Sequence, residues 1–181
     1  FYKWGIIGAG KISEKFAEGL KSSAKAECYA VASRDMAKAE EFASKNGFKK
    51  AYGSYEAMLA DPEVDIVYIA TPNNLHYSNT IAALSAGKNV LCEKPFALNS
   101  KELAEMIELA RSKKLFLMEA LWSRFLPSVV KVKELIESEK LGKAHVVQAD
   151  FGFISEYNPE GRLFNPSLGG GSLLDIGIYP V

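Results

Sequence analysis

Two hydrophobic periods alternate along the first two-thirds of the chain. Short apolar runs bounded by Gly, Pro or charged residues predict buried strands. These runs lie at residues 2–7, 28–32, 50–52, 64–70, 89–92 and 115–118. Between them, apolar residues recur every three or four positions, as they do along one face of a helix. The helical stretches lie at residues 12–20, 36–43, 55–60, 75–86 and 99–110. Repeated strand–helix units predict an α/β fold with a parallel, doubly wound sheet of the Rossmann kind.

Two local signals support the helix ends. Gly87 follows the stretch 75–86 and predicts a C-cap, because glycine readily adopts the left-handed conformation that ends many helices. Asn99 with Glu102 fits a capping box in which Asn replaces the usual Ser or Thr.

The pattern changes after Glu119, and we place a domain boundary near Leu121. Residues 1–120 are then the doubly wound domain, and residues 121–181 begin a second domain. A helical stretch at 129–136 is followed by an alternating stretch at 144–154, which predicts a strand of an antiparallel sheet. Three glycines then lead into a predicted helix that carries Asp175 and Tyr179 on one face. The second domain is therefore predicted to be α+β.

Composition narrows the class of protein. Of the 181 residues, 48% are apolar, which supports a substantial core, and the 22 basic residues balance the 22 acidic ones. Balanced charge argues against a nucleic-acid or membrane-surface partner. No run of about 18 apolar residues predicts a membrane span. Cys28 and Cys92 lack metal-type spacing, so we expect no metal site and free thiols in a reducing compartment. Without a visible signal peptide, a cytoplasmic location is expected.

Unusual polar residues follow five of the predicted strands. They are Gly8–Ala9–Gly10, Ser33–Arg34–Asp35, Thr71–Pro72–Asn73–Asn74, Glu93–Lys94–Pro95 and Glu119, with His76 just beyond the third group. In doubly wound sheets the ligand crevice lies beyond the carboxyl ends of the strands. The sequence therefore predicts that these groups meet around one binding site.

The segment GAGKIS, residues 8–13, predicts dinucleotide binding. Gly8 allows a tight turn, and Gly10 lets the backbone approach a pyrophosphate at the start of the next helix, where Lys11 and Ile12 lie. Ser13 occupies the position of the third small residue of the Gly-x-Gly-x-x-Gly fingerprint. The alternative is a purely structural glycine turn.

The end of the second strand bears on the cofactor. An NAD site usually has an acidic residue here, whereas this chain has Ser33 and Arg34 first and Asp35 after them. A guanidinium and a hydroxyl suit the 2′-phosphate of NADP, so we expect NADP, with NAD as the alternative. In the competing interpretation Arg34 is an ordinary surface charge and Asp35 a helix N-cap.

Two further groups carry candidate chemistry. Glu93–Lys94–Pro95 is either a solvated turn or a turn that holds Lys94 rigidly at the rim of the crevice. Asp175 and Tyr179 are either a buried hydrogen-bonded pair or a substrate-facing acid/base pair.

These motifs resemble, in order, the Gfo/Idh/MocA oxidoreductase family: Gly8–Ala9–Gly10, Thr71–Pro72–Asn73 with His76, Glu93–Lys94–Pro95 and Asp175–Ile176–Gly177–Ile178–Tyr179. The segment MEALWSRFLP with Tyr179 resembles the branch that contains dimeric dihydrodiol dehydrogenases and NADP-dependent D-xylose dehydrogenases. The resemblance implies a Rossmann domain, a second domain on a large open sheet that often dimerises, and a lysine brought to the nicotinamide. Family members are much longer, so we expect this chain to be a fragment with an incomplete second domain.

The resemblance also implies roles for single residues. We expect reversible hydride transfer, with Tyr179 as acid/base, Lys94 as its electrostatic partner and Asp175 orienting the substrate or Lys94. Cofactor contacts are expected from Thr71, Pro72, Asn73, His76, Glu93 and Lys94. The substrate side is expected to include Trp122, Arg124, Phe125, Phe153 and Arg162, with Phe151 in the same apolar wall. Ordinary core aromatics, a solvated Arg162 and a surface histidine at His76 are the alternatives.

The expected function is an NADP-dependent dehydrogenase of sugars or cyclic trans-diols, working as a homodimer or higher homo-oligomer. A dinucleotide-binding sensor without turnover is the alternative, because the same fold hosts non-catalytic regulators.

Overall fold

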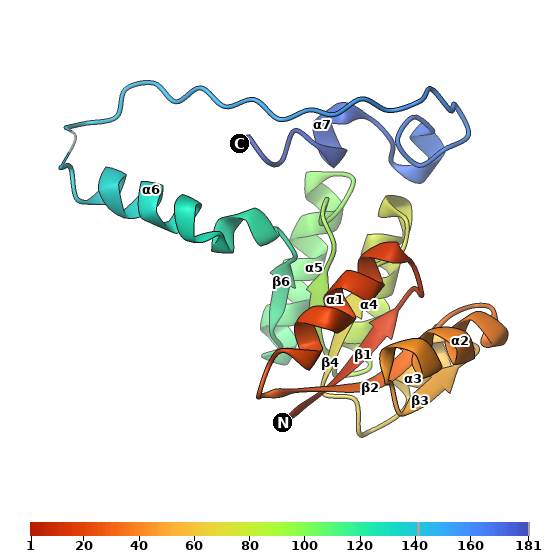
Figure 1. The fold of residues 1–181 in the computed structure, drawn as a ribbon. Helices are drawn as coiled ribbons and strands as arrows, with labels where there is room; N and C mark the ends of the chain where they lie inside the picture. The colour runs from red at the N-terminus through yellow and green to blue at the C-terminus, as the bar shows by residue number, and fades with distance from the viewer. Residues whose placement is uncertain (141, 181) are drawn as a thin grey trace. The chain divides into compact units, whose positions relative to one another are not determined.

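The computed structural model describes residues 1–140 and 142–180 and divides the chain into two compact units (Figure 1). The first unit is Phe1–Glu119, and the second begins at Ala120. Among the described residues, no helix has the length and apolar character needed to cross a membrane.

The first unit is built on a six-stranded sheet in which every neighbouring pair is parallel. Its strands are β1 (Tyr2–Ile7), β2 (Ala26–Ala32), β3 (Lys50–Tyr52), β4 (Ile66–Ile69), β5 (Asn89–Cys92) and β6 (Leu117–Glu119). Its α-helices are α1 (Lys11–Lys21), α2 (Met36–Asn46), α3 (Tyr55–Leu59), α4 (His76–Ser85) and α5 (Ser100–Lys113). The order β3-β2-β1-β4-β5-β6 is that of a Rossmann fold, so the predicted fold class of this part is confirmed.

The chain reverses its winding direction between β1 and β4, which lie side by side in the centre of the sheet. Strands β1 to β3 are laid down toward one edge, and β4 to β6 toward the other. A crevice forms at such a switch point, beyond the carboxyl ends of the strands. The topology thus brings the ends of β1 and β4 next to each other.

Continuous apolar runs form the strands because both faces of a parallel sheet are covered. Ile7, Val67, Ile69 and Val90 have no exposed surface and belong to one hydrophobic cluster. Helix ends agree closely with the predicted signals. The Asn99 side chain accepts from the N–H of Glu102, but the Glu102 carboxylate accepts from the N–H of Leu98 instead of closing the box on Asn99.

The second unit contains η2 (Trp122–Phe125), α6 (Pro127–Glu137), η3 (Pro166–Leu168) and α7 (Ser172–Asp175). The predicted strand at 144–154 is wrong, because residues 143–157 form no β-structure. A strand forms only with a hydrogen-bonded partner, and the described part of this unit contains no other strand. Val146, Val147 and Ile154 are consequently exposed.

The predicted helix through Tyr179 is also wrong in extent. Helix α7 ends at Asp175, and residues 176–180 form turns, so Asp175 and Tyr179 do not share a helical face. Gly177 is a poor helix former, and Pro180 disfavours a helical conformation of the residue before it.

Candidate active site

The glycine loop after β1 has the geometry that a phosphate site needs. Gly8 has φ +102°, and a Cβ at this position would lie 2.8 Å from the carbonyl oxygen of Ala70, so another residue does not fit here. Gly10 caps α1 without a side-chain hydrogen bond, and a Cβ there would meet nothing within 4 Å. The space and the amides before α1 therefore fit a pyrophosphate.

Ser13 does more than fill the third fingerprint position. Its side chain is fully buried, and its hydroxyl donates to the carbonyl oxygen of Gly8 at 2.5 Å. The first turn of α1 is thereby tied to the glycine loop. Lys11 and Ile12, in the same turn, are exposed.

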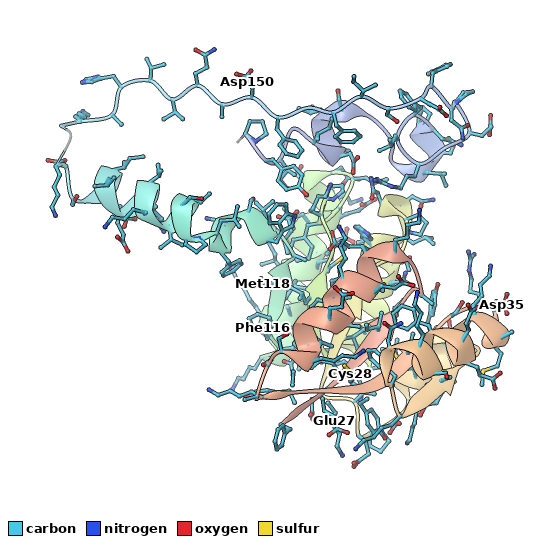
Figure 2. All side chains as sticks on the ribbon, in the orientation of Figure 1. Glu27, Cys28, Asp35, Phe116, Met118 and Asp150 are labelled. Atoms are coloured by element: carbon cyan, nitrogen blue, oxygen red, sulfur yellow. The ribbon has the colours of Figure 1, made fainter. Side chains whose placement is uncertain are left out.

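The loop after β2 uses its acidic residue for folding. The carboxylate of Asp35 accepts from the N–H groups of Ala37 and Lys38, which confirms the N-cap interpretation of Asp35. Figure 2 shows Asp35 beside α2. The hydroxyl of Ser33 accepts from the N–H of Asp35. Arg34 is exposed. In this loop, therefore, Arg34 is an exposed cation, and the Asp35 carboxylate already accepts hydrogen bonds from the N-terminus of α2.

The segment after β4 is held by His76. His76 is buried, so the interpretation as a surface histidine is wrong. Its Nε2 lies 2.9 Å from the carbonyl oxygen of Thr71, and its Nδ1 lies 2.7 Å from that of Pro95. The imidazole thus bridges the segments that come after β4 and β5. Thr71 and Asn73 are buried as well, while Pro72 is exposed.

The Glu93–Lys94–Pro95 turn is braced on several sides. The N–H of Glu93 donates to Ile69, and the Glu93 carboxylate accepts from the hydroxyl of Tyr68 and from the N–H of Lys94. The Lys94–Pro95 peptide bond is cis, and Pro95 is buried. The segment after β5 is therefore not a freely solvated turn.

Glu119, at the end of β6, adds a further brace. Its Oε1 accepts from the N–H of Phe96 at 2.8 Å. Glu119 and His76 therefore contact the two residues that follow Lys94, from β6 and from α4 respectively.

Tyr68 was not predicted as a site residue. A tyrosine in a buried strand needs a hydrogen-bond partner for its hydroxyl, and this need is the signal by which the sequence could have identified it. The acceptor, Glu93, lies 25 residues away. Burial and the neighbouring Glu93 carboxylate hold the Tyr68 pKa well above its usual range, so its hydroxyl keeps its proton and donates.

Tyr179 of the second unit is surrounded by aromatic side chains. The indole N–H of Trp122 donates to the Tyr179 hydroxyl at 3.2 Å, and the Phe151 ring lies 4.7 Å from that of Tyr179. Phe125 and Phe153 are exposed and take part in no ring pair among residues 1–140 and 142–180. Only part of the predicted apolar wall is therefore assembled around Tyr179 within this unit.

Asp175 is engaged by an arginine. The guanidinium of Arg162 donates to Oδ1 of Asp175 at 3.0 Å, so Arg162 is not merely solvated. Arg124, in η2, is exposed. The described residues contain no cluster of three or more His, Cys, Asp or Glu side chains arranged to hold a metal ion.

Comparison with known families agrees with this geometry. Residues 2–121 match the model described as "Oxidoreductase family, NAD-binding Rossmann fold", and residues 129–181 match the GFO/IDH/MocA C-terminal domain. The chain belongs to the Gfo/Idh/MocA oxidoreductase family.

Individual relatives narrow the comparison. The chain is 45% identical to trans-1,2-dihydrobenzene-1,2-diol dehydrogenase of Danio rerio, over 98% of this chain and 53% of the relative. It is 42% identical to D-xylose 1-dehydrogenase (NADP(+)) of Hypocrea jecorina, over 99% of this chain and 51% of the relative. The chain thus spans about half the length of these relatives.

Solved structures give the same picture. An NAD binding oxidoreductase from Klebsiella pneumoniae superposes with a TM-score of 0.73 at 36% identity, covering 76% of this chain and 39% of that one. Levoglucosan dehydrogenase in complex with NADH and L-sorbose gives a TM-score of 0.74 at 29% identity, covering 78% and 40%.

Proposed function

We propose that the whole protein is an NADP-dependent dehydrogenase that transfers hydride to or from a hydroxyl-bearing carbon of a sugar or a cyclic trans-diol. The observation that carries this proposal is the braced Glu93–Lys94–Pro95 turn. This turn follows β5, and the N-terminus of α1 follows β1, so both lie at the carboxyl ends of the parallel strands. The relatives that act on dihydrodiols and xylose support the substrate class.

The cofactor would be held by the first unit. Gly8, Ala9 and Gly10 with the first turn of α1 would take the pyrophosphate, and Thr71, Asn73 and His76 would line the nicotinamide side. When bound, the nicotinamide accepts or supplies the hydride. NADP is preferred in this proposal because Arg34 is exposed, whereas the Asp35 carboxylate caps α2 and is less available to a ribose hydroxyl.

The proton would be handled by Tyr179. Oxidation of an alcohol needs a base for the hydroxyl proton, and carbonyl reduction needs an acid that returns it. The indole N–H of Trp122 donates to the Tyr179 hydroxyl. We assign the ammonium of Lys94 as the electrostatic partner of Tyr179 and as the substrate anchor. Asp175, paired with Arg162, would orient the substrate hydroxyl.

We also propose the organisation around this site. Residues 1–120 would be the dinucleotide-binding domain, and residues 121–181 the start of the substrate and dimerisation domain. The exposed apolar side chains Val146, Val147 and Ile154 support a further sheet or a second copy that covers them. The free thiols of Cys28 and Cys92 support a cytoplasmic location.

A substrate panel tests the function. The full-length protein is mixed with NADP or NAD and with aldoses or cyclic trans-diols, and reduced nicotinamide is followed by absorbance. We expect turnover with NADP and one substrate class. Cofactor binding without turnover across the panel would favour the alternative, a dinucleotide-binding sensor.

Two variants test the assigned roles. Lys94→Met and Tyr179→Phe should reduce turnover at least about a hundredfold, because acid/base catalysis typically contributes 10²–10⁴-fold. NADP binding, measured by fluorescence, should stay largely intact. Lys101→Met and Tyr157→Phe change exposed residues of the same types and should leave turnover unchanged. Unaltered turnover in both site variants would contradict the mechanism.

A further inference from the structure

Tyr68 is fixed inside the sheet by aromatic contacts. It lies in β4 with 2% of its surface exposed. Its ring stacks on that of Phe16 in α1, with 3.8 Å between centroids and 19° between planes. Phe16 in turn meets Trp4 of β1 edge-on at 5.2 Å. The ring of Tyr68 therefore has little freedom to move, so the position of its hydroxyl is fixed.

The Tyr68 hydroxyl donates to the carboxylate of Glu93, the residue before Lys94. The Tyr68 oxygen lies 2.5 Å from Oε1 of Glu93, and Oε2 of the same carboxylate accepts from the N–H of Lys94 at 3.1 Å. Both carboxylate oxygens are therefore engaged, one by the sheet interior and one by the backbone of the lysine. Hydrogen bonds to an ionised group are shorter and stronger than neutral ones.

We propose that Tyr68 is a positioning residue for Lys94. Its hydroxyl fixes the Glu93 carboxylate, and the carboxylate fixes the backbone from which the Lys94 side chain extends. The proposal goes beyond the assigned dehydrogenase site, and its catalytic consequence rests on the proposed function. The Phe16–Tyr68 stack also connects this brace to α1, whose N-terminus is assigned to the cofactor pyrophosphate.

The reason such a brace matters is geometric. A lysine side chain has four rotatable bonds, so its ammonium is placed reproducibly only if the backbone beneath it is held. Misplacing a catalytic group by about 1 Å can cost about a hundredfold in rate. Supporting hydrogen bonds around the contacting residues supply this precision.

Tyr68→Phe isolates the hydroxyl, because it keeps the ring that stacks on Phe16. Tyr77→Phe is the matched control. Tyr77 also donates to a carboxylate at 2.5 Å, that of Glu105, but this exposed pair joins α4 to α5 instead of joining β4 to the segment after β5. The two variants therefore remove the same kind of hydrogen bond at two places.

Steady-state kinetics of the full-length protein give the first measurement. We expect Tyr68→Phe to lower kcat about tenfold or more while KM for NADP changes less than about threefold. A residue that only stabilised the fold would not separate kcat from KM in this way. Tyr77→Phe should change neither value. Equal kcat values in wild type and Tyr68→Phe would overturn the proposal.

Hydrogen exchange gives a second measurement that needs no turnover. The amide of Lys94 should exchange several-fold faster in Tyr68→Phe than in wild type, and Tyr77→Phe should leave it unchanged. Unchanged exchange at Lys94 in Tyr68→Phe would contradict the positioning role. A wild-type protein without turnover would instead contradict the proposed function, and the exchange result would still decide the role of Tyr68.

A second variant covers the case in which Tyr68→Phe does not fold. Glu93→Met keeps the length of the side chain but removes both carboxylate oxygens, so the Tyr68 hydroxyl and the Lys94 amide both lose their partner. We expect the same loss of kcat and the same faster exchange at Lys94. Wild-type values for both would overturn the proposal.

Discussion

The imidazole of His76 lies 2.7 Å from the carbonyl oxygen of Pro95 and so joins α4 to the turn that carries Lys94. The other ring nitrogen faces the carbonyl oxygen of Thr71 at 2.9 Å. Carbonyl oxygens only accept, so a neutral imidazole, with one N–H, donates to one of the two carbonyls, and an imidazolium donates to both. In either form one buried side chain lies between two of the segments assigned to the cofactor site.

Replacing His76 should loosen both segments. We expect His76→Leu to lower kcat/KM for NADP about tenfold or more, because the Thr71 and Pro95 segments lose their common partner. Cofactor titration by fluorescence and steady-state kinetics measure the effect. His145→Leu is the control, since His145 is the other histidine of the chain and is exposed. Equal losses in the two variants would count against the bridging role.

Substitutions of the two glycines in the loop after β1, Gly8 and Gly10, should affect different properties of the protein. Gly10→Ala should leave the thermal midpoint unchanged, because the added methyl group meets nothing within 4 Å, but it should weaken NADP binding by occupying the pyrophosphate space. Gly8→Ala should lower stability by roughly 1–3 kcal/mol, because of its φ of +102° and the close Ala70 oxygen. Calorimetry and cofactor titration separate the two effects.

The control for this pair is Gly19→Ala in α1, where an added Cβ also meets nothing within 4 Å. It should not weaken NADP binding. If Gly10→Ala binds NADP as tightly as Gly19→Ala does, the pyrophosphate does not lie before α1.

Arg34 should decide the choice between NADP and NAD. Arg34→Ala should weaken NADP binding by roughly tenfold to a hundredfold and leave NAD binding nearly unchanged, since a charge-assisted hydrogen bond to a phosphate is worth about 1.5–3 kcal/mol. Dissociation constants for both cofactors give the ratio. Arg111→Ala, which changes an exposed arginine of α5, should alter neither. If Arg34→Ala lowered the affinity for NADP and for NAD by comparable factors, the assignment of Arg34 to the 2′-phosphate of NADP would be wrong.

Asp61 should make the first unit sensitive to acid. Its Oδ2 accepts from the hydroxyls of Tyr29 and Tyr52 and from the ammonium of Lys50. Burial acts to raise the Asp61 pKa, but these hydrogen bonds and one from the N–H of Glu63 outweigh it and hold the pKa well below its usual range. The folded chain therefore stabilises the ionised form of Asp61 more than the unfolded chain does.

The sign of the pH effect is set by that lowered pKa. The stabilisation is fully present above the unfolded Asp pKa of 3.8 and is lost as the pH falls from there through the folded pKa. At pH 7, Asp61→Asn should cost on the order of 2 kcal/mol. Urea unfolding at pH 7 and near pH 3.5 should show this difference narrowing in acid.

Glu108→Gln is the control for Asp61, because it neutralises an exposed carboxylate of α5 in the same unit. It should be nearly neutral at both pH values. A difference between wild type and Asp61→Asn that stays constant with pH would show that packing, not the charge, is what the substitution disturbs.

Much of the first unit could be predicted because its signals are local. Apolar runs and helical spacings identify the strands and helices within a few residues, and Asn99 caps α5 as the sequence indicates. The second unit shows the limit of such reasoning. The alternation at 144–154 has strand periodicity, but a ladder needs a neighbour, and none lies within the described part of that unit.

The candidate site divides in the same way. Gly8, Lys94 and His76 stand out because their residue types are unusual at the ends of apolar runs. Tyr68 is hidden in such a run, and a pattern of apolar positions does not show which acceptor its hydroxyl finds.

By itself the sequence determined the alternation of strands and helices, the glycine loop and the polar residues at the strand ends, because these depend on neighbours along the chain. The tertiary structure alone decided the order β3-β2-β1-β4-β5-β6, the bond from Tyr68 to Glu93 and the bridge from His76 to Pro95. Those relationships join residues 19 or more positions apart. Their geometry exists only after the sheet has brought β4 beside β5, which no local pattern specifies.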